Sequence, residues 1–188
     1  HKQLNVLERA VEADLKSGKS LFRNGILLLV YVHGWQNNAK DGNGNLEEFR
    51  KLLQQTAAKE TNRGVLGVYV SWRGESWRVP GIKHAVTYWG RKRVAHDFGH
   101  GNLVETLARL KNLEWLVARG GGMRSTPDQQ VFERCRMVCV GHSFGAAALY
   151  SAVAQPIEAG FQVPYWEKRR YGTGQTTMEQ VTGMGDLV

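Results

Sequence analysis

The sequence has no apolar run long enough to cross a membrane. Its apolar runs, such as residues 26–32 and 137–140, are far shorter than the roughly 20 residues that a transmembrane helix needs. The amino-terminal residues also lack the charged and then apolar segments of a signal peptide. We therefore expect neither a membrane span nor an export signal.

Cysteine is scarce, which excludes a disulfide scaffold. Cys135 and Cys139 are the only two cysteines, and they lie four residues apart in one apolar stretch. In a strand they would share a face but lie too far apart to form a disulfide. Two unpaired thiols fit a reducing compartment, so we predict a cytoplasmic protein.

The chain is basic, with a formal net charge of +8, but it has no dense block of one sign. A dispersed pattern favours a solvated basic surface, so we expect no nucleic-acid partner and keep nucleic-acid binding as a less favoured alternative. No residue pattern indicates an oligomeric state. The dispersed cations include Arg9, Lys51, Arg63, Arg91, Arg109 and Arg169.

Residues 1–188 fit a single domain without internal repeats. Helical and extended periodicities alternate, which predicts an α/β fold with a mostly parallel central sheet and helices on both faces. Residues 155–185 form a polar stretch with little periodicity, and residues 186–188 resemble the start of a fourth strand, so we expect a sheet that is incomplete at the C-terminus. The predicted strands are 26–32, 65–70 and 137–140, and the predicted helices are 6–16, 46–58, 91–118 with a bend at Gly99 and Gly101, and 144–154.

The strongest motif is Gly141-His142-Ser143-Phe144-Gly145, a G-x-S-x-G sequence between an apolar strand and a helix of small residues. A nucleophilic serine needs a tight strand-to-helix turn, and glycines two residues before and after it relieve the crowding there. Chance alone produces many G-x-S-x-G matches, but both flanks are as this chemistry requires. The pattern predicts Ser143 as a catalytic nucleophile, with a simple glycine-rich turn as the alternative.

A second motif, His33-Gly34-Trp35-Gln36, follows the strand at residues 26–32. An oxyanion hole in such a site combines the backbone N–H after the nucleophile with one from the loop after this kind of strand. We therefore assign the two donors to Phe144 and Trp35, with Gln36 as the fallback. The alternative is an ordinary loop between a strand and a helix.

With these motifs the chain resembles the α/β-hydrolase superfamily, in particular serine esterases and lipases whose oxyanion loop begins with His-Gly. The resemblance implies a three-layer sandwich, an acyl-enzyme on Ser143, a small-molecule acyl substrate, and no metal or organic cofactor. Residues that it places at the substrate are His33, Gly34, Gln36, His142 and Trp72. A catalytically silent hydrolase fold that serves as a binding module is the alternative function.

The chain departs from the family in one respect, because family members order the triad as serine, acid and histidine. No histidine follows Ser143, so the acid and base are not assigned. We expect a piece of a longer protein that is inactive alone. His33 is expected to fix the loop and His142 to pack beside the sheet, and His96 with His100 lacks a third metal ligand.

Residues 71–90 interleave tryptophans with basic residues after a predicted strand. Loops at the carboxyl ends of strands line pockets in hydrolases, so we predict a lid or pocket-lining loop. Stacking of nucleic-acid bases on these aromatics is the alternative.

Overall fold

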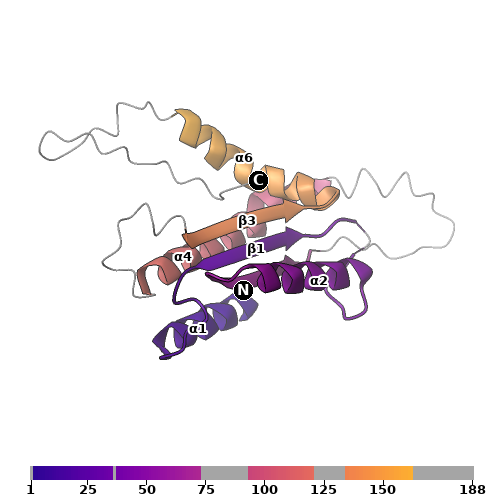
Figure 1. Ribbon diagram of the computed structural model, residues 1–188. Helices are drawn as coiled ribbons and strands as arrows, with labels where there is room; N and C mark the ends of the chain where they lie inside the picture. The colour runs from indigo at the N-terminus through magenta and orange to yellow at the C-terminus, as the bar shows by residue number, and fades with distance from the viewer. Residues whose placement is uncertain (1, 36, 73–92, 121–133, 163–188) are drawn as a thin grey trace, which may run out of the picture.

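The computed structural model describes residues 2–35, 37–72, 93–120 and 134–162. Within these ranges one parallel sheet forms in the order β2-β1-β3 (Figure 1). The strands are β1 (Ile26–Val32), β2 (Gly64–Val70) and β3 (Cys135–Gly141). The register pairs Ile26 with both Gly64 and Cys135, so the strands start together at one edge and end together at the other. The predicted α/β class with a parallel sheet is confirmed for this part of the chain.

The helices largely follow the predicted periodicity. They are α1 (Lys2–Lys16), α2 (Gly44–Lys59), the π-helical η1 (Gly99–Leu103), α4 (Val104–Gly120) and α6 (Phe144–Gln162), and residues 93–98 are also helical and lead into η1. The predicted end of the last helix at Ala154 is wrong, because α6 continues through Pro156 to Gln162. Proline removes one helical hydrogen bond, but its fixed φ is itself helical, so the turn can continue. The predicted strand at 186–188 lies outside the described residues.

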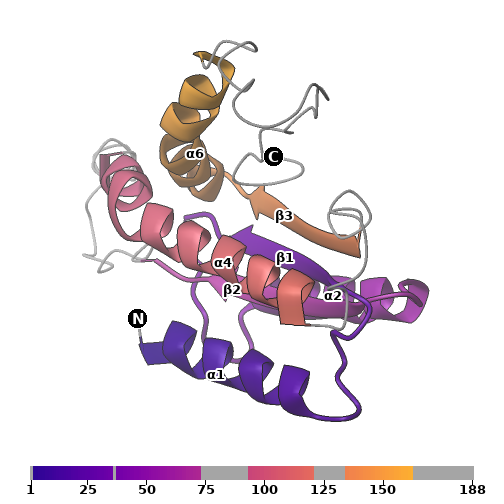
Figure 2. The same cartoon turned by 90° about the vertical axis from the view of Figure 1, so that its left-hand side faces the viewer.

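Different helices cover the two faces of the sheet. Alternate residues of β1, beginning with Ile26 and Leu28, are fully buried in one apolar core with Met137 of β3. Leucines of α4 belong to the same core, and α4 lies between α1 and α6 on this face (Figure 2). On the opposite face, Phe49 of α2 packs against Tyr31 and Tyr69, with ring centroids 5.5 and 5.8 Å away. Helices therefore pack on both faces of the sheet, as the buried strands require.

The predicted bend in the long helix is confirmed at η1. Gly101 has φ −105° and ψ −107°, which interrupts the helix that continues as α4. Gly99 lies against α6, where an added Cβ would come within 2.7 Å of Ser151 Cβ. The absence of a side chain at Gly99 therefore lets the two helices approach closely.

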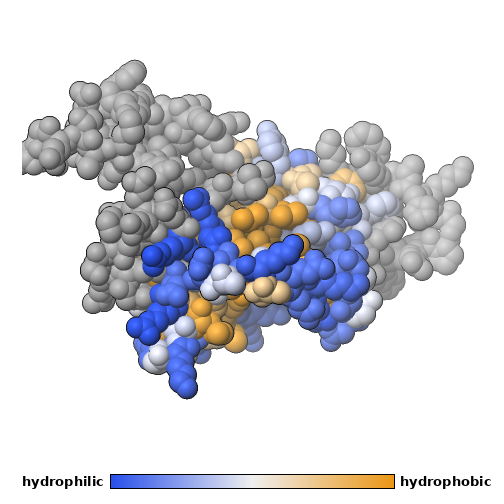
Figure 3. All heavy atoms as spheres, in the orientation of Figure 1, coloured by the Kyte–Doolittle hydropathy of each residue, from blue (hydrophilic) through white to orange (hydrophobic). Residues whose placement is uncertain are grey.

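Helix α2 covers only part of the sheet face against which it packs. Val140, at the end of β3, remains 45% exposed. Figure 3 shows apolar side chains grouped over β1 and β3 and bordered by hydrophilic residues. Among the described helices, none combines the length and the apolar character that a bilayer crossing requires.

Both cysteines are buried in β3, and neither forms a disulfide. They alternate with half-buried residues, so they share the core face, as the strand periodicity predicts. Burial raises the pKa of the Cys135 thiol. Because it is only 2% exposed, we read Cys135 as a residue of the apolar core.

Candidate active site

Ser143 occupies the sharp turn that the motif predicts. β3 ends at Gly141 and α6 begins at Phe144, so the serine stands between the strand and the helix. Its φ of 55° is the only positive value among the non-glycine residues that the structure describes. A left-handed conformation costs an L-residue roughly 1–2 kcal/mol, so the surrounding contacts must hold it in place. The predicted strand-to-helix turn with a strained serine is confirmed.

The two glycines of the motif are required by close packing. A Cβ on Gly141 would lie 2.7 Å from the Ala146 nitrogen, inside the first turn of α6. A Cβ on Gly145 would lie 2.5 Å from the carbonyl oxygen of His33, at the end of β1. Either side chain would push α6 away from the sheet. The glycines therefore fix the place of Ser143 at the carboxyl edge.

The loop after β1 meets this turn directly. The His142 N–H donates to the Val32 carbonyl oxygen at 3.0 Å. Gly34 is buried, and a Cβ on it would lie 3.0 Å from Ser143 Cβ and 2.7 Å from His142 Nδ1. The His-Gly loop and the serine turn are therefore in contact at the same edge of neighbouring strands. An oxyanion hole shared between the two segments would need this proximity.

The side chains of the two predicted oxyanion donors also touch. The Trp35 ring packs edge-on against Phe144, with centroids 6.3 Å apart and planes at 70°. The N–H groups that follow Phe144 are already used, because Gly145 donates to His142 and Ala146 to Ser143, both at 2.9 Å. The donor roles of Trp35 and Phe144 remain predictions. Gln36, the fallback donor, lies outside the described residues.

His33 holds the loop after β1 in place through both of its ring nitrogens. Its Nε2 accepts a hydrogen bond from the Trp72 backbone N–H at 3.2 Å, so a neutral ring carries its proton on Nδ1. Nδ1–H then donates to the Gly34 carbonyl oxygen at 2.7 Å. Ser71 Oγ lies 3.2 Å from Nε2. Burial lowers the pKa of His33, which favours this neutral form.

Trp72 makes further contacts that hold His33 in place. Its Nε1–H donates to the His33 carbonyl oxygen at 2.7 Å, and the two rings stack with centroids 5.9 Å apart. The side chain of His33 is fully buried, and Trp72 is only 7% exposed. The contacts therefore support a positioning role for both residues rather than direct contact with a substrate. The rest of the predicted lid, residues 73–90, lies outside the described residues.

An aromatic and amide network next to His33 was not found by sequence reasoning. Tyr69 stacks on His33 with centroids 5.6 Å apart, and its hydroxyl donates to Asn45 Oδ1 at 2.9 Å. Asn45 Nδ2 donates to the Tyr31 hydroxyl at 3.0 Å. Burial raises the pKa of Tyr69 to about 12, with a smaller contribution from Tyr31. The network ties the start of α2 to the ends of β1 and β2, and no motif in the sequence marks it.

Among the described residues, none of the other histidines makes a hydrogen bond with the Ser143 side chain. His142 is exposed and its ring lies against Gly34. His96 Nδ1 lies 2.5 Å from Ser151 Oγ on α6, and Ser151 Oγ donates to the Ala147 carbonyl oxygen at 2.9 Å. His100 is exposed on η1, and no group of three metal-binding side chains occurs in the described ranges. His96 therefore joins two helices, a role that its spacing from His100 does not reveal.

Comparisons with protein-family models, with curated proteins and with solved structures find no significant match to this chain.

Proposed function

We propose that this chain carries the nucleophile half of a serine hydrolase that acts on an ester or related acyl bond. The observation that carries the proposal is the conformation of Ser143, with φ 55° in a G-x-S-x-G turn between a parallel strand and a helix. Strain of this kind at an exposed nucleophilic side chain is typical of a functional site. The adjacent His-Gly loop supports an α/β-hydrolase-like three-layer fold.

In the proposed reaction, a lone pair of Ser143 Oγ attacks the carbonyl carbon while a base takes the hydroxyl proton. The carbonyl electrons move to oxygen, and the N–H groups of Phe144 and Trp35 hold the oxyanion. Collapse of this intermediate expels the leaving group, which takes the proton from the base, and forms the acyl-enzyme. Water then hydrolyses the acyl-enzyme to the free acid and restores the Ser143 hydroxyl. Loss of one donor lowers such a rate by about 10²- to 10³-fold.

The proposed base is a histidine outside residues 1–188, because the resemblance places it after Ser143 and no histidine follows Ser143 in the sequence. Both ring nitrogens of His33 are engaged, and His96 is bound to Ser151. The acid that would orient the base is likewise unassigned. For this reason we expect residues 1–188 alone to show no turnover of a short-chain p-nitrophenyl ester, because an unassisted serine hydroxyl is a weak nucleophile.

Labelling with a fluorophosphonate tests the nucleophile separately from turnover. We expect peptide mass spectrometry to locate the adduct on Ser143, with a rate that rises when imidazole is added as an external base. In a serine hydrolase that lacks its base, the oxyanion hole and substrate binding together still accelerate acyl transfer by about 10³- to 10⁴-fold over water. Ser143→Ala removes the adduct, whereas Ser17→Ala, at an exposed serine in an ordinary turn, leaves it unchanged.

The same experiment separates the competing functions. A folded protein whose Ser143 stays unlabelled even with imidazole would be a silent hydrolase-like fold used for binding. Ester turnover by residues 1–188 that is lost in His142→Ala would place the base within the described residues and correct our assignment.

A further inference from the structure

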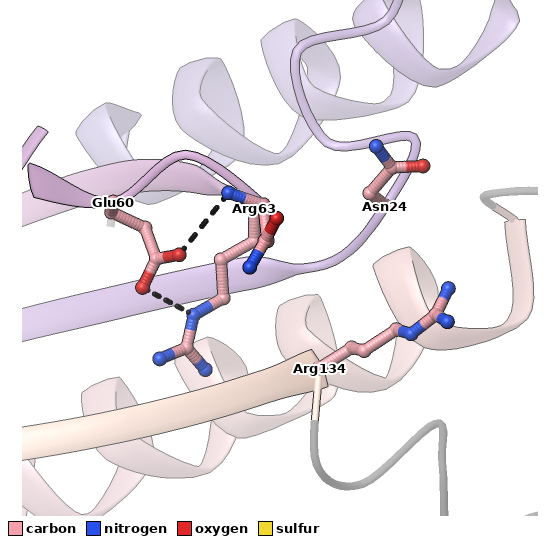
Figure 4. Close-up of a pocket in the computed structure, with 5 residues that line it drawn as sticks. Asn24, Glu60, Arg63 and Arg134 are labelled. Atoms are coloured by element: carbon pink, nitrogen blue, oxygen red, sulfur yellow. Dashed lines mark hydrogen bonds and ion pairs between the residues drawn. The ribbon is translucent and has the colours of Figure 1, made fainter.

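The edge of the sheet opposite Ser143 carries a polar hollow. Its volume is about 710 Å³, and Figure 4 shows the side chains around it. It lies where the three strands begin, so it is separate from the proposed catalytic edge. The lining residues are Asn24, Glu60, Asn62, Arg63 and Arg134.

Strand pairing brings these residues together from three parts of the chain. The Gly64 N–H donates to the Gly25 carbonyl oxygen at 3.1 Å, which joins the start of β2 to the start of β1. Gly25 has φ 124° and lies against the backbone of Arg134, where a side chain would not fit. Two arginines that are distant in the sequence therefore line one hollow.

The carboxylate in the lining is already satisfied. Glu60 Oε2 accepts from Arg63 Nε at 2.9 Å, and Glu60 Oε1 accepts from the Asn62 N–H at 3.3 Å. The Arg63 guanidinium holds the pKa of Glu60 below its ordinary value, so the carboxylate stays ionised. This pair fixes Arg63 through Nε, and its two Nη groups make no hydrogen bond or ion pair among the described residues.

Arg134 supplies a second cation. It is exposed and makes no side-chain hydrogen bond or ion pair within the described ranges. The lining thus contains two guanidinium groups, one carboxylate that is already paired, and two side-chain amides. Figure 4 shows that Arg63 extends toward Glu60 and Arg134 extends away from it, so the two guanidinium groups would meet different parts of a ligand. Such a surface attracts an anion, since charge and hydrogen-bond donors both favour it.

We infer that this hollow binds a small molecule that carries a phosphate group. Guanidinium groups bind phosphate with two parallel hydrogen bonds, and the side-chain amides of Asn24 and Asn62 offer donors or acceptors to the rest of the ligand. The volume falls within the usual range of small-molecule sites, while the polar lining excludes an apolar ligand. A concave site also suits a soluble phosphate better than a headgroup in a flat membrane.

Calorimetric titration of residues 1–188 with inorganic phosphate and with pyrophosphate at low ionic strength tests this site. We expect saturable binding with a Kd of about 1 mM or tighter. Arg134→Gln should weaken it about tenfold or more, because one charged contact is lost. Arg9→Gln is the matched control, since Arg9 is exposed on α1 and makes no ion pair among the described residues. It should leave binding unchanged.

A second variant, Asn24→Asp, places a carboxylate in the hollow and should weaken phosphate binding by repulsion while the circular dichroism spectrum stays native. The inference is overturned if neither probe binds, or if Arg9→Gln weakens binding as much as Arg134→Gln. Sedimentation with anionic phospholipid vesicles that requires Arg134, without binding of either soluble probe, would also overturn it. None of these outcomes bears on Ser143, because its labelling is measured at the other edge of the sheet.

Discussion

Replacement of His33 by alanine should destabilise the protein strongly, because the ring connects three groups at the carboxyl edge. Without it, the Trp72 N–H and Ser71 Oγ lose the acceptor at Nε2, and the Gly34 carbonyl oxygen loses its donor. A buried polar group left unsatisfied costs roughly 1–3 kcal/mol. Loss of the stacked ring adds roughly 0.5–1.5 kcal/mol. We expect a total loss of about 3–5 kcal/mol in the free energy of unfolding, allowing for water reaching one of the groups.

Two conservative variants separate the contributions of the ring nitrogens. Glutamine can present an acceptor where Nε2 lies, and asparagine can present a donor where Nδ1 lies. We expect His33→Gln to recover about half of the loss, because it restores the acceptor for the Trp72 N–H. Urea denaturation followed by tryptophan fluorescence measures all three variants. If His33→Ala lowers the free energy of unfolding by less than about 0.5 kcal/mol, as an ordinary surface substitution does, then His33 does not hold these segments together.

The same histidine predicts an acid-sensitive stability. The folded-state pKa of His33 lies below its ordinary value of 6.5, so the unfolded chain takes up the proton first as the pH falls. The contribution is fully present above about pH 6.5 and is lost as the pH falls toward the folded-state pKa. Asp14 and Glu60 act in a lower window, since their lowered pKa values matter only below about 3.8 and 4.5. A His33→Gln variant should therefore lose less stability than the native chain between pH 7 and pH 5.

Two substitutions and one chemical modification test the site and the core further. Ser143→Gly should raise the free energy of unfolding, measured by urea denaturation, by about 0.5–1 kcal/mol, because glycine adopts a φ of 55° without strain. The same change should abolish labelling. A destabilised variant would show that the turn is not strained. Gly145→Ala should lower the free energy of unfolding by about 2 kcal/mol or more, because the added Cβ would collide with the end of β1. Gly18→Ala is the control, since Gly18 has open space around it, and it should change the free energy of unfolding by less than about 0.5 kcal/mol. Similar values for both variants would contradict the close packing at Gly145. Both cysteines, Cys135 and Cys139, should resist a thiol reagent such as DTNB in the native protein and react fully in denaturant, and rapid native reaction would place the thiols at the surface.

Local sequence patterns predicted the elements that carry the proposed site. The run from Ile26 to Val32 is a strand with the predicted bounds, because consecutive apolar β-branched and aliphatic residues suit a strand buried on both faces. The turn at Ser143 followed from its two glycines, since only a residue without Cβ fits there. The predicted end of the last helix at Ala154 was wrong, because the low periodicity of the polar stretch after it did not reveal that α6 continues to Gln162.

The contacts between distant segments depended on the tertiary structure. Nothing in the sequence pairs His33 with Trp72, because a hydrogen bond across two strands depends on their register rather than on local spacing. The dispersed arginines likewise predicted a solvated basic surface, but the parallel register brings Arg63 and Arg134 to one hollow. Periodicity thus determined which residues form strands and helices and which residues form the serine turn. Only strand pairing decided which side chains meet at the two edges of the sheet, because that choice is made by packing between residues far apart in the chain.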